Sequence, residues 1–183
     1  MIRSFALALL LPLAVAAQTQ AEAPNAILLV AKPTLVDPNF RETVVLVTQA
    51  ADASTVGVIL NRPLARKHDR TGETVYLGGP VMREVLVALF RSERAPEESA
   101  FHVLNGIYLT MHPHNIEALL TERGSEYRLY AGFSGWAPGQ LQGELERDGW
   151  YVLAPSDELL FRSDTRGMWS ELERKARARV AMR

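Results

Sequence analysis

Short apolar runs separated by polar links recur along the first third of the chain. Residues 26–31, 43–48 and 56–60 are rich in β-branched and other apolar side chains, and turn-forming residues flank each run. Runs of this length between turn residues are typical of strands that are buried on at least one face. Because the links are short, the three strands are predicted to pair mainly antiparallel.

Further short elements are predicted in the rest of the chain. The run 85–90 fits a helix or a strand by pattern, but its β-branched content and the preceding Gly-Gly-Pro favour a strand. The charged segments 65–73 and 91–100 are interpreted as solvent-exposed loops. Other strands are expected at residues 74–77, 107–110, 127–131 and 150–153, and helical segments at 115–121 and 156–161.

The order of these elements predicts the fold class. Strands and helices are intermixed without the regular alternation of a doubly wound sheet, so α+β is favoured over α/β. No Pro-, Gly- or Ser-rich linker divides the main part of the chain, and 183 residues suffice for one domain with a hydrophobic core. We therefore expect a single α+β domain.

The C-terminal segment predicts an amphipathic helix. Asp164 or Thr165 is placed to cap the free amides of its first turn. One stripe of apolar residues recurs at helical spacing and is predicted to pack inward: Trp169, Leu172, Ala176 and Val180.

The last ten residues, RKARARVAMR, carry cations and no acid. Cations at the C-terminal end of a helix suit the helix dipole, which is a structural explanation. The alternative is a patch for anionic lipid headgroups or for an acidic partner. The cations are Arg174, Lys175, Arg177, Arg179 and Arg183.

Residues 1–17 are predicted to be a secretory signal peptide. Arg3 precedes an apolar run over residues 5–13, and Ala14-Val15-Ala16 fits a cleavage site, although cleavage as late as residue 23 also fits. The apolar run is shorter than the roughly 20 residues that span a bilayer. We expect the domain over residues 24–183 and the protein in the periplasm or secreted; a buried N-terminal helix is the alternative.

Charge and cysteine content exclude several classes of function. The formal net charge is −1, and removal of Arg3 with the leader leaves 19 basic against 21 acidic residues, or −2. This balance provides no global field for nucleic acid, so no nucleic-acid partner is expected. The chain has no cysteine, which excludes disulfides and thiol nucleophiles.

The four histidines do not predict a metal centre. His112 and His114 flank a proline and offer two imidazoles, but no acidic residue adjoins them. A metal site needs three or four converging ligands with outer hydrogen bonds, so turn chemistry is favoured for this pair. The other two histidines are His68 and His102, and no metal or cofactor is expected.

No catalytic constellation emerges from the sequence. Ser134 lies in Phe-Ser-Gly without the Gly-x-Ser-x-Gly spacing of a nucleophile elbow. The Gly-Gly-Pro at residues 78–80 lacks the following Lys and Ser or Thr of a phosphate-binding loop. Glu144 and Glu146 are typical of a solvated helix rather than of an acid–base pair.

The stretch GFSGWAPGQLQGELERDGW, residues 132–150, is predicted to be a structural corner. Its glycines permit positive φ or close backbone approach, and its tryptophans are large enough to fill a core between sheet and helix. Gln140 is placed to bond turn amides, with Glu144 one helical turn later on the same face. A ligand-binding role would suit Gln140 and Glu144 equally well. The structural residues are Gly132, Gly135, Gly139, Trp136 and Trp150.

Several blocks together resemble one known family. KPTLVDPNFRETVVLVTQ, GVILNRPL, VYLGGPV and AGFSGWAPGQLQGEL occur in that order, followed by LAPSDELLF. They closely resemble the UPF0301 family, also called YqgE/AlgH. The positions that match the family pattern are Asp37, Pro38, Phe40, Asn61, Pro63, Gly78, Gly79, Pro80, Trp136, Gly139, Gln140, Leu141, Glu144, Trp150 and Pro155.

The resemblance implies a fold but no particular reaction. The implied fold is a mostly antiparallel, bifurcated sheet that curls into a pseudo-barrel with flanking helices. Family members are usually cytoplasmic, which makes the cytoplasm the alternative to export. The family's FVLHS block reads VALFRS here, so its histidine is absent.

Two functional hypotheses follow. The first is a non-catalytic binding or regulatory module that receives a small ligand or a protein in a cleft between the turns at 61–63 and 78–80 and the helix start at 140–144. Its candidate ligand-binding residues are Asp37, Asn61, Arg62, Gly78, Gly79, Gln140 and Glu144. The alternative is a hydrolase that acts with water through Asp37, Glu144 or Ser134.

Overall fold

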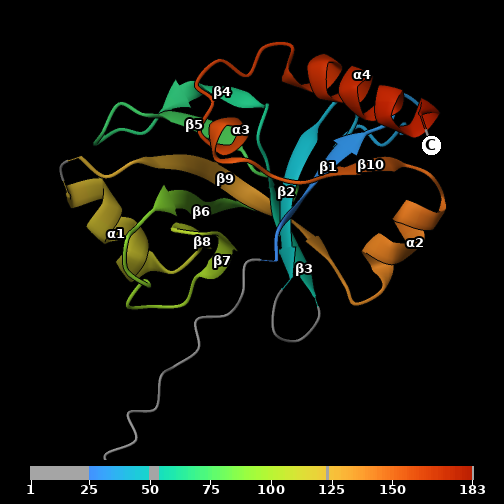
Figure 1. Cartoon of the computed structure of the whole chain (residues 1–183). Coiled ribbons are helices and arrows are strands. Elements are labelled where there is room, and N and C mark those ends of the chain that lie inside the picture. The colour runs from blue at the N-terminus through green and yellow to red at the C-terminus, as the bar shows by residue number, and fades with distance from the viewer. Residues whose placement is uncertain (1–24, 50–53, 123, 183) are drawn as a thin grey trace, which may run out of the picture.

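The computed structural model describes residues 25–49, 54–122 and 124–182. Within them, ten strands form one large sheet and four helices lie against it (Figure 1). The chain is thus a single α+β domain, as the sequence predicted. The expected leader and its cleavage sites lie outside the described residues.

One branch of the sheet contains the first three strands and the last one. Strands β1 (Ile27–Ala31), β2 (Val44–Gln49) and β3 (Thr55–Ile59) pair antiparallel in chain order, and β10 (Trp150–Leu153) adds to the free edge of β1. Their apolar runs are nearly continuous because both faces are covered. In β1, Leu28 belongs to one core cluster and Leu29 to another.

The sheet divides into two branches at the long strand β9 (Tyr127–Trp136). Residues 134–136 pair with β3, whereas residues 129–131 pair with two strands of the second branch. The sheet curls without closing, and β7 near one end approaches β2 (Figure 1). The second branch consists of β4 (Pro63–Lys67), β5 (Thr74–Leu77), β6 (Val81–Arg91), β7 (Phe101–Leu104) and β8 (Ile107–Thr110).

The sequence prediction missed two strands and shortened two others. It assigned most of β4 to a loop and overlooked β7, because both are short strands near sheet edges and neither shows a continuous apolar run. It began β6 four residues late, since Met82, Arg83 and Glu84 are exposed. It also ended β9 at Ala131, although Gly132 to Trp136 continues the strand.

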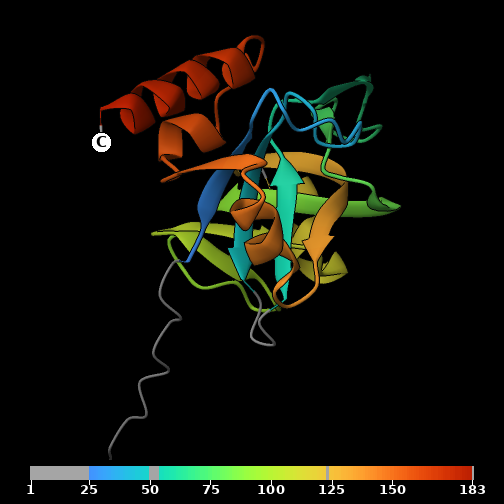
Figure 2. The same ribbon diagram turned by 90° about the vertical axis from the view of Figure 1, so that its right-hand side faces the viewer.

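The helices cover different parts of the sheet (Figures 1 and 2). Helix α1 packs Ile116 and Leu119 into the core beside β6, and α4 packs on β1 and β10. No described helix has the length and apolarity needed to cross a bilayer. The bounds are α1 (Pro113–Thr121), α2 (Gln140–Glu146), α3 (Asp157–Leu160) and α4 (Met168–Ala181).

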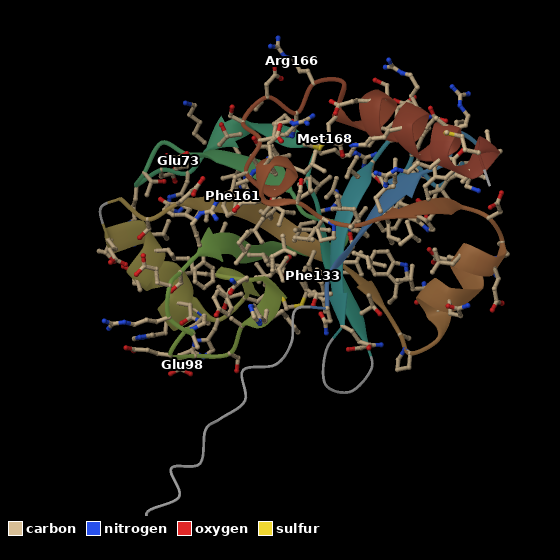
Figure 3. The ribbon with its side chains drawn as sticks, viewed as in Figure 1. Glu73, Glu98, Phe133, Phe161, Arg166 and Met168 are labelled. Atoms are coloured by element: carbon tan, nitrogen blue, oxygen red, sulfur yellow. The ribbon has the colours of Figure 1, made fainter. Side chains whose placement is uncertain are left out.

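Helix α4 begins differently from the prediction. Its N-cap is Gly167 at φ 71°, with no side-chain cap, because the Asp164 carboxylate accepts instead from the amide and guanidinium of Arg166. The predicted cap at Asp164 or Thr165 is therefore wrong. Figure 3 shows Met168 on the inner side of the helix start and Arg166 directed outward. Leu172 and Ala176 are buried as predicted, but Val180 is exposed.

Candidate functional site

Glu144 ties two tryptophans to helix α2. Its Oε2 atom accepts hydrogen bonds from the indole N–H groups of Trp136 and Trp150, each at 3.1 Å. Its Oε1 atom accepts from Nε2 of Gln140 at 3.3 Å. Both indoles are buried, so the cluster joins β9, α2 and β10 through one carboxylate. The predicted corner is confirmed as a structural joint.

The backbone of this joint depends on its glycines. Gly139 precedes α2 at φ 80°, and Oε1 of Gln140 accepts the Ala137 amide at 3.2 Å. Gly132 has φ 69°, and a Cβ atom there would lie 2.6 Å from the Val81 carbonyl oxygen. Gly135 has no positive φ, and the nearest atom to a Cβ there would be a Phe133 ring carbon at 3.4 Å, so neither reason that the sequence prediction gave applies to this glycine.

Phe40 connects the tryptophans to a neighbouring loop. Its ring stacks on Trp136 with centroids 5.7 Å apart and meets Trp150 edge-on at the same distance. The Arg62 guanidinium holds this loop by donating to the carbonyls of Asn39 at 2.6 Å and Arg41 at 2.8 Å. Burial lowers the pKa of Arg62, and the nearby cation of Arg41 acts in the same direction.

Asn61 and Asp37 serve the same loop. Asn61 accepts the Val44 amide at 2.9 Å through Oδ1 and donates to the Glu42 carbonyl at 3.0 Å through Nδ2. The Asp37 carboxylate accepts the Asn39 amide at 2.8 Å, a turn typical of aspartate. Five of the predicted site residues therefore make contacts within the protein, either to the loop that carries Phe40 or to the tryptophans and helix beside it: Asp37, Asn61, Arg62, Gln140 and Glu144.

Gly78 and Gly79 lie against the middle of β9. A Cβ atom at Gly78 would lie 2.0 Å from the Gly132 carbonyl oxygen, and one at Gly79 would lie 2.3 Å from the Phe133 backbone. Only glycine fits such distances. Ser134 is fully buried and donates to the Gly78 carbonyl at 3.1 Å. The glycines thus allow two backbone segments to approach.

The histidines lie away from these residues. His68 contacts Thr71 and His102 stacks on Tyr108, while His112 and His114 lie 3.7 Å from Glu98 and Glu97 respectively. In the described part of the chain, no three His, Asp or Glu side chains are grouped to hold a metal ion. The structure therefore brings no histidine to Asp37, Ser134 or Glu144. The role of the seven predicted residues as ligand contacts stays a prediction.

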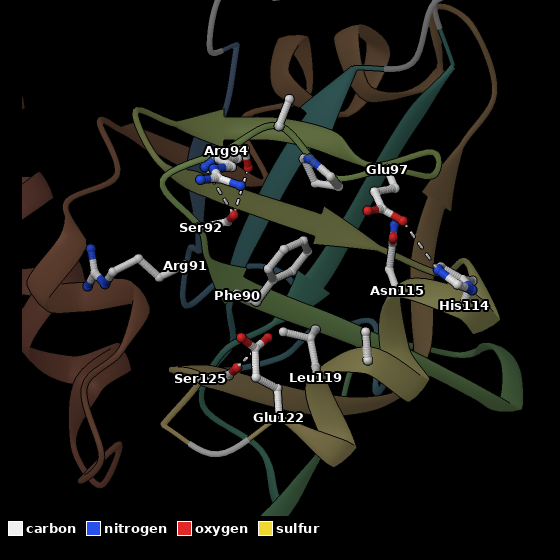
Figure 4. A pocket seen from close by; sticks show the side chains of 13 residues that line it. Phe90, Arg91, Ser92, Arg94, Glu97, His114, Asn115, Leu119, Glu122 and Ser125 are labelled. Carbon is white, nitrogen blue, oxygen red and sulfur yellow. Dashed lines mark hydrogen bonds and ion pairs between the residues drawn. The ribbon is translucent and has the colours of Figure 1, made fainter.

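A hollow of about 350 Å³ lies beside α1 (Figure 4), on the other side of the molecule from α2 (Figure 1). Phe90 and Leu119 form its apolar floor. Its polar lining carries both charges: Arg94, Glu97, His114, Asn115, Glu122 and Ser125. The sequence prediction missed this hollow because the segment 91–100 reads as an ordinary polar loop. The sequence feature that could have indicated it is the order of charges in this segment, where Arg94 is followed by Ala-Pro-Glu-Glu.

Two contacts fix the walls of this hollow. Asn115 is buried, and its Nδ2 donates to the Glu98 carbonyl at 3.1 Å and to Thr110 Oγ1 at 3.2 Å, which holds the loop on α1. Arg91 turns away from the hollow (Figure 4) and forms two 2.6 Å hydrogen bonds to Asp157. These bonds raise the pKa of Arg91. Among the described residues, no carboxylate lies within ion-pair distance of Arg94.

Sequence comparisons identify the family. Residues 28–181 match the AlgH-like family model. A UPF0301 protein of Mycobacterium tuberculosis is 34% identical over 165 residues, which cover 81% of this chain and 80% of the relative. The chain belongs to the UPF0301 (YqgE/AlgH) family. Another UPF0301 protein, from Chlorobaculum tepidum, is 31% identical over 153 residues, covering 78% of this chain and 81% of its own.

Solved structures share the UPF0301 fold. A crystal structure of a Corynebacterium diphtheriae protein superposes with a TM-score of 0.68 at 21% identity, covering 85% of this chain and 87% of the other. The solution structure of the AlgH protein from Pseudomonas aeruginosa superposes with a TM-score of 0.66 at 23% identity, covering 80% of this chain and 85% of the other. In this UPF0301 chain, the pattern residues Phe40, Trp136, Gln140, Glu144 and Trp150 form the internal network described above.

Proposed function

We propose that this UPF0301 chain is a non-catalytic binding or regulatory module. The observation that carries the proposal is that each group named for the hydrolase alternative accepts or donates a hydrogen bond within the protein. Ser134 is fully buried, Glu144 accepts from two indoles, and Asp37 caps its own turn. A nucleophile or base has to reach a substrate atom, and Ser134 and Glu144 are bound to the protein instead, while the exposed Asp37 uses one carboxylate oxygen in its own turn.

We propose the hollow beside α1 as the place of binding. An apolar floor with polar groups of both charges around it offers contacts to a small molecule that has both charges and an apolar part. Arg94 is available for a carboxylate or phosphate, and Glu97 with Glu122 for an ammonium group. The ligand class that fits is a small zwitterion with an apolar part.

The binding proposal is tested by titrating zwitterionic amino acids and dipeptides into the isotope-labelled protein and following amide chemical shifts. Shifts are expected at Arg94, Glu97 and Glu122. Arg94→Gln is expected to raise the dissociation constant obtained from these shifts at least tenfold. Arg66→Gln, at an exposed position on β4, is the control. Shifts confined to residues around Arg62 and Glu144 would favour the cleft predicted from the sequence instead.

The hydrolase alternative is tested with chromogenic ester, phosphate and peptide substrates. No turnover above buffer is expected for the wild-type chain. Turnover that disappears in folded Asp37→Asn, Ser134→Ala or Glu144→Gln variants would overturn the proposal.

We also propose that the protein is exported to the periplasm or secreted. The basic start, the apolar run over residues 5–13 and the Ala14-Val15-Ala16 motif support export. The family match begins only at residue 28, so the proposed leader precedes the family-like region. Cell fractionation with N-terminal sequencing is the test. A start after residue 16, 17 or 23 in the exported fraction is expected, whereas an intact chain in the cytoplasm would contradict export.

A further inference from the structure

Helix α4 is anchored over its first half and exposed at its end. Met168, Leu172 and Ala176 are buried, and the Trp169 indole donates to the Ala31 carbonyl at 2.8 Å. Val180 stands one turn after Ala176 and continues the same stripe, yet it is 62% exposed. The last turn therefore carries the apolar stripe past the protein's own core, and the C-terminal end of α4 projects from the body in Figure 2.

Other apolar side chains are exposed around this turn. Met182 is 88% exposed, and Val152 on the facing strand β10 is 50% exposed. A hollow of about 140 Å³ between β10 and α4 is bordered by Val152, Arg179 and Val180. An apolar surface is thus present where the helix leaves the sheet, with a cation on its border.

The same turns carry a concentration of positive charge. Arg174, Lys175, Arg177 and Arg179 are all exposed, and no acidic residue occurs between positions 174 and 182. Arg177 lies 3.6 Å from Glu173, while in the described ranges none of the other three is within ion-pair distance of a carboxylate. The whole chain has a net charge of −1, so this patch is local.

We propose that the end of α4 docks onto an anionic phospholipid membrane surface. The cations bind the lipid headgroups, and Met182, which shares a side of the helix with Lys175 and Arg179, enters the boundary between headgroups and acyl chains. Basic residues near such a surface and apolar residues buried in it both contribute to binding by amphipathic helices. The helix dipole alone explains the cations but not the exposed apolar side chains.

A fluorescent label reports docking at this position directly. Because the chain has no cysteine, Met182→Cys provides a single thiol for an environment-sensitive dye, and Met82→Cys, at an exposed methionine on β6, provides the control. Phosphatidylglycerol vesicles are expected to shift the emission to the blue at position 182 and not at position 82. Equal shifts at both positions, equal shifts with phosphatidylcholine vesicles, or no shift would overturn the proposal.

Charge variants in the full-length protein separate the α4 patch from general electrostatics. Two double variants remove the same amount of charge from two exposed places: Lys175→Gln/Arg179→Gln on α4 and Arg66→Gln/Lys67→Gln on β4. Both keep the N-terminal residues, so these residues contribute equally to any vesicle binding of the two variants. At about fivefold in affinity per basic residue, the first pair is expected to weaken vesicle binding, read as the lipid concentration that gives half of the emission shift at position 182, by roughly 30-fold. The second pair is expected to leave it within about twofold.

The remaining occupant to exclude is an acidic protein. Soluble polyglutamate offers the same charge without an apolar interior, so it is expected to leave the emission at position 182 unshifted. If polyglutamate reproduces the blue shift, or if the two charge pairs weaken vesicle binding equally, the membrane proposal is overturned.

Discussion

The carboxylate of Glu144 accepts the indole hydrogen bond of Trp150 at 3.1 Å, and through it the α2 corner is fastened to strand β10. The same oxygen accepts from Trp136, so removal of the carboxylate leaves two buried indole donors without a partner. Glu144→Ala is expected to reduce the free energy of unfolding by about 2–4 kcal/mol. Urea denaturation measures this value. Glu146→Ala, which removes an exposed carboxylate of the same helix, is expected to change it by less than about 0.5 kcal/mol.

Arg62 is expected to stabilise the loop that carries Phe40. A lysine has no planar fork and cannot reach the carbonyls of Asn39 and Arg41 together, so Arg62→Lys is expected to cost about 1–2 kcal/mol of unfolding free energy. Because Phe40 packs on Trp136 and Trp150, the tryptophan emission is also expected to change. The exposed neighbour Arg41→Lys is the control. An unchanged emission and stability in Arg62→Lys would contradict the structural role.

Tyr130 predicts a loss of stability in alkali. The side chain is fully buried, its hydroxyl has no hydrogen-bond partner among the described residues, and burial raises its pKa to about 12. The unfolded chain releases this proton near pH 10 and the folded chain near pH 12. The protonated hydroxyl therefore makes its full contribution to the free energy of unfolding below pH 10, and this contribution is lost between pH 10 and pH 12.

The loss attributable to Tyr130 amounts to about 2–3 kcal/mol. Tyr130→Phe is expected to lack this part of the alkaline destabilisation and to match or exceed the wild type in stability at neutral pH. Urea denaturation at several pH values measures both. Parallel pH curves for the two proteins would show that Tyr130 does not titrate as described.

Two glycines predict opposite effects of alanine. At Gly79 a Cβ atom would overlap the Phe133 backbone, so Gly79→Ala is expected to cost more than about 3 kcal/mol or to prevent folding. At Gly143 in helix α2, the nearest atom beyond the helix backbone is 3.9 Å away on an Arg147 side chain. Gly143→Ala is therefore expected to stabilise by about 0.5–1 kcal/mol. Thermal unfolding compares the two, and equal effects would refute the close packing at Gly79.

The sequence predicted those parts of the fold that depend on local pattern. The continuous apolar runs of β1, β2 and β3 identified buried strands, and Gln140 and Glu144 were expected on one helical face, where they are hydrogen-bonded. Strand β4 could not be found in this way, because its residues are mostly exposed and its place depends on pairing with β5.

The candidate site was harder to predict because side-chain polarity does not distinguish a ligand contact from an internal one. Asn61 and Arg62 looked available in the sequence, yet their partners are loop carbonyls and amides that only the tertiary fold brings within reach. The hollow beside α1 depends on Asn115 holding residues 98 and 99 against the helix, a contact that spans 16 and 17 positions. Spacing in the sequence gives no indication of such contacts.

The central claim is that the polar residues of the UPF0301 pattern form a structural network. The most direct test is a double-mutant cycle of Glu144→Ala and Trp150→Phe, read from urea denaturation of the two single variants and the double variant. A coupling free energy of about 1–3 kcal/mol is predicted, because each substitution removes the same buried hydrogen bond. Additive effects, with a coupling below about 0.3 kcal/mol, would contradict the claim.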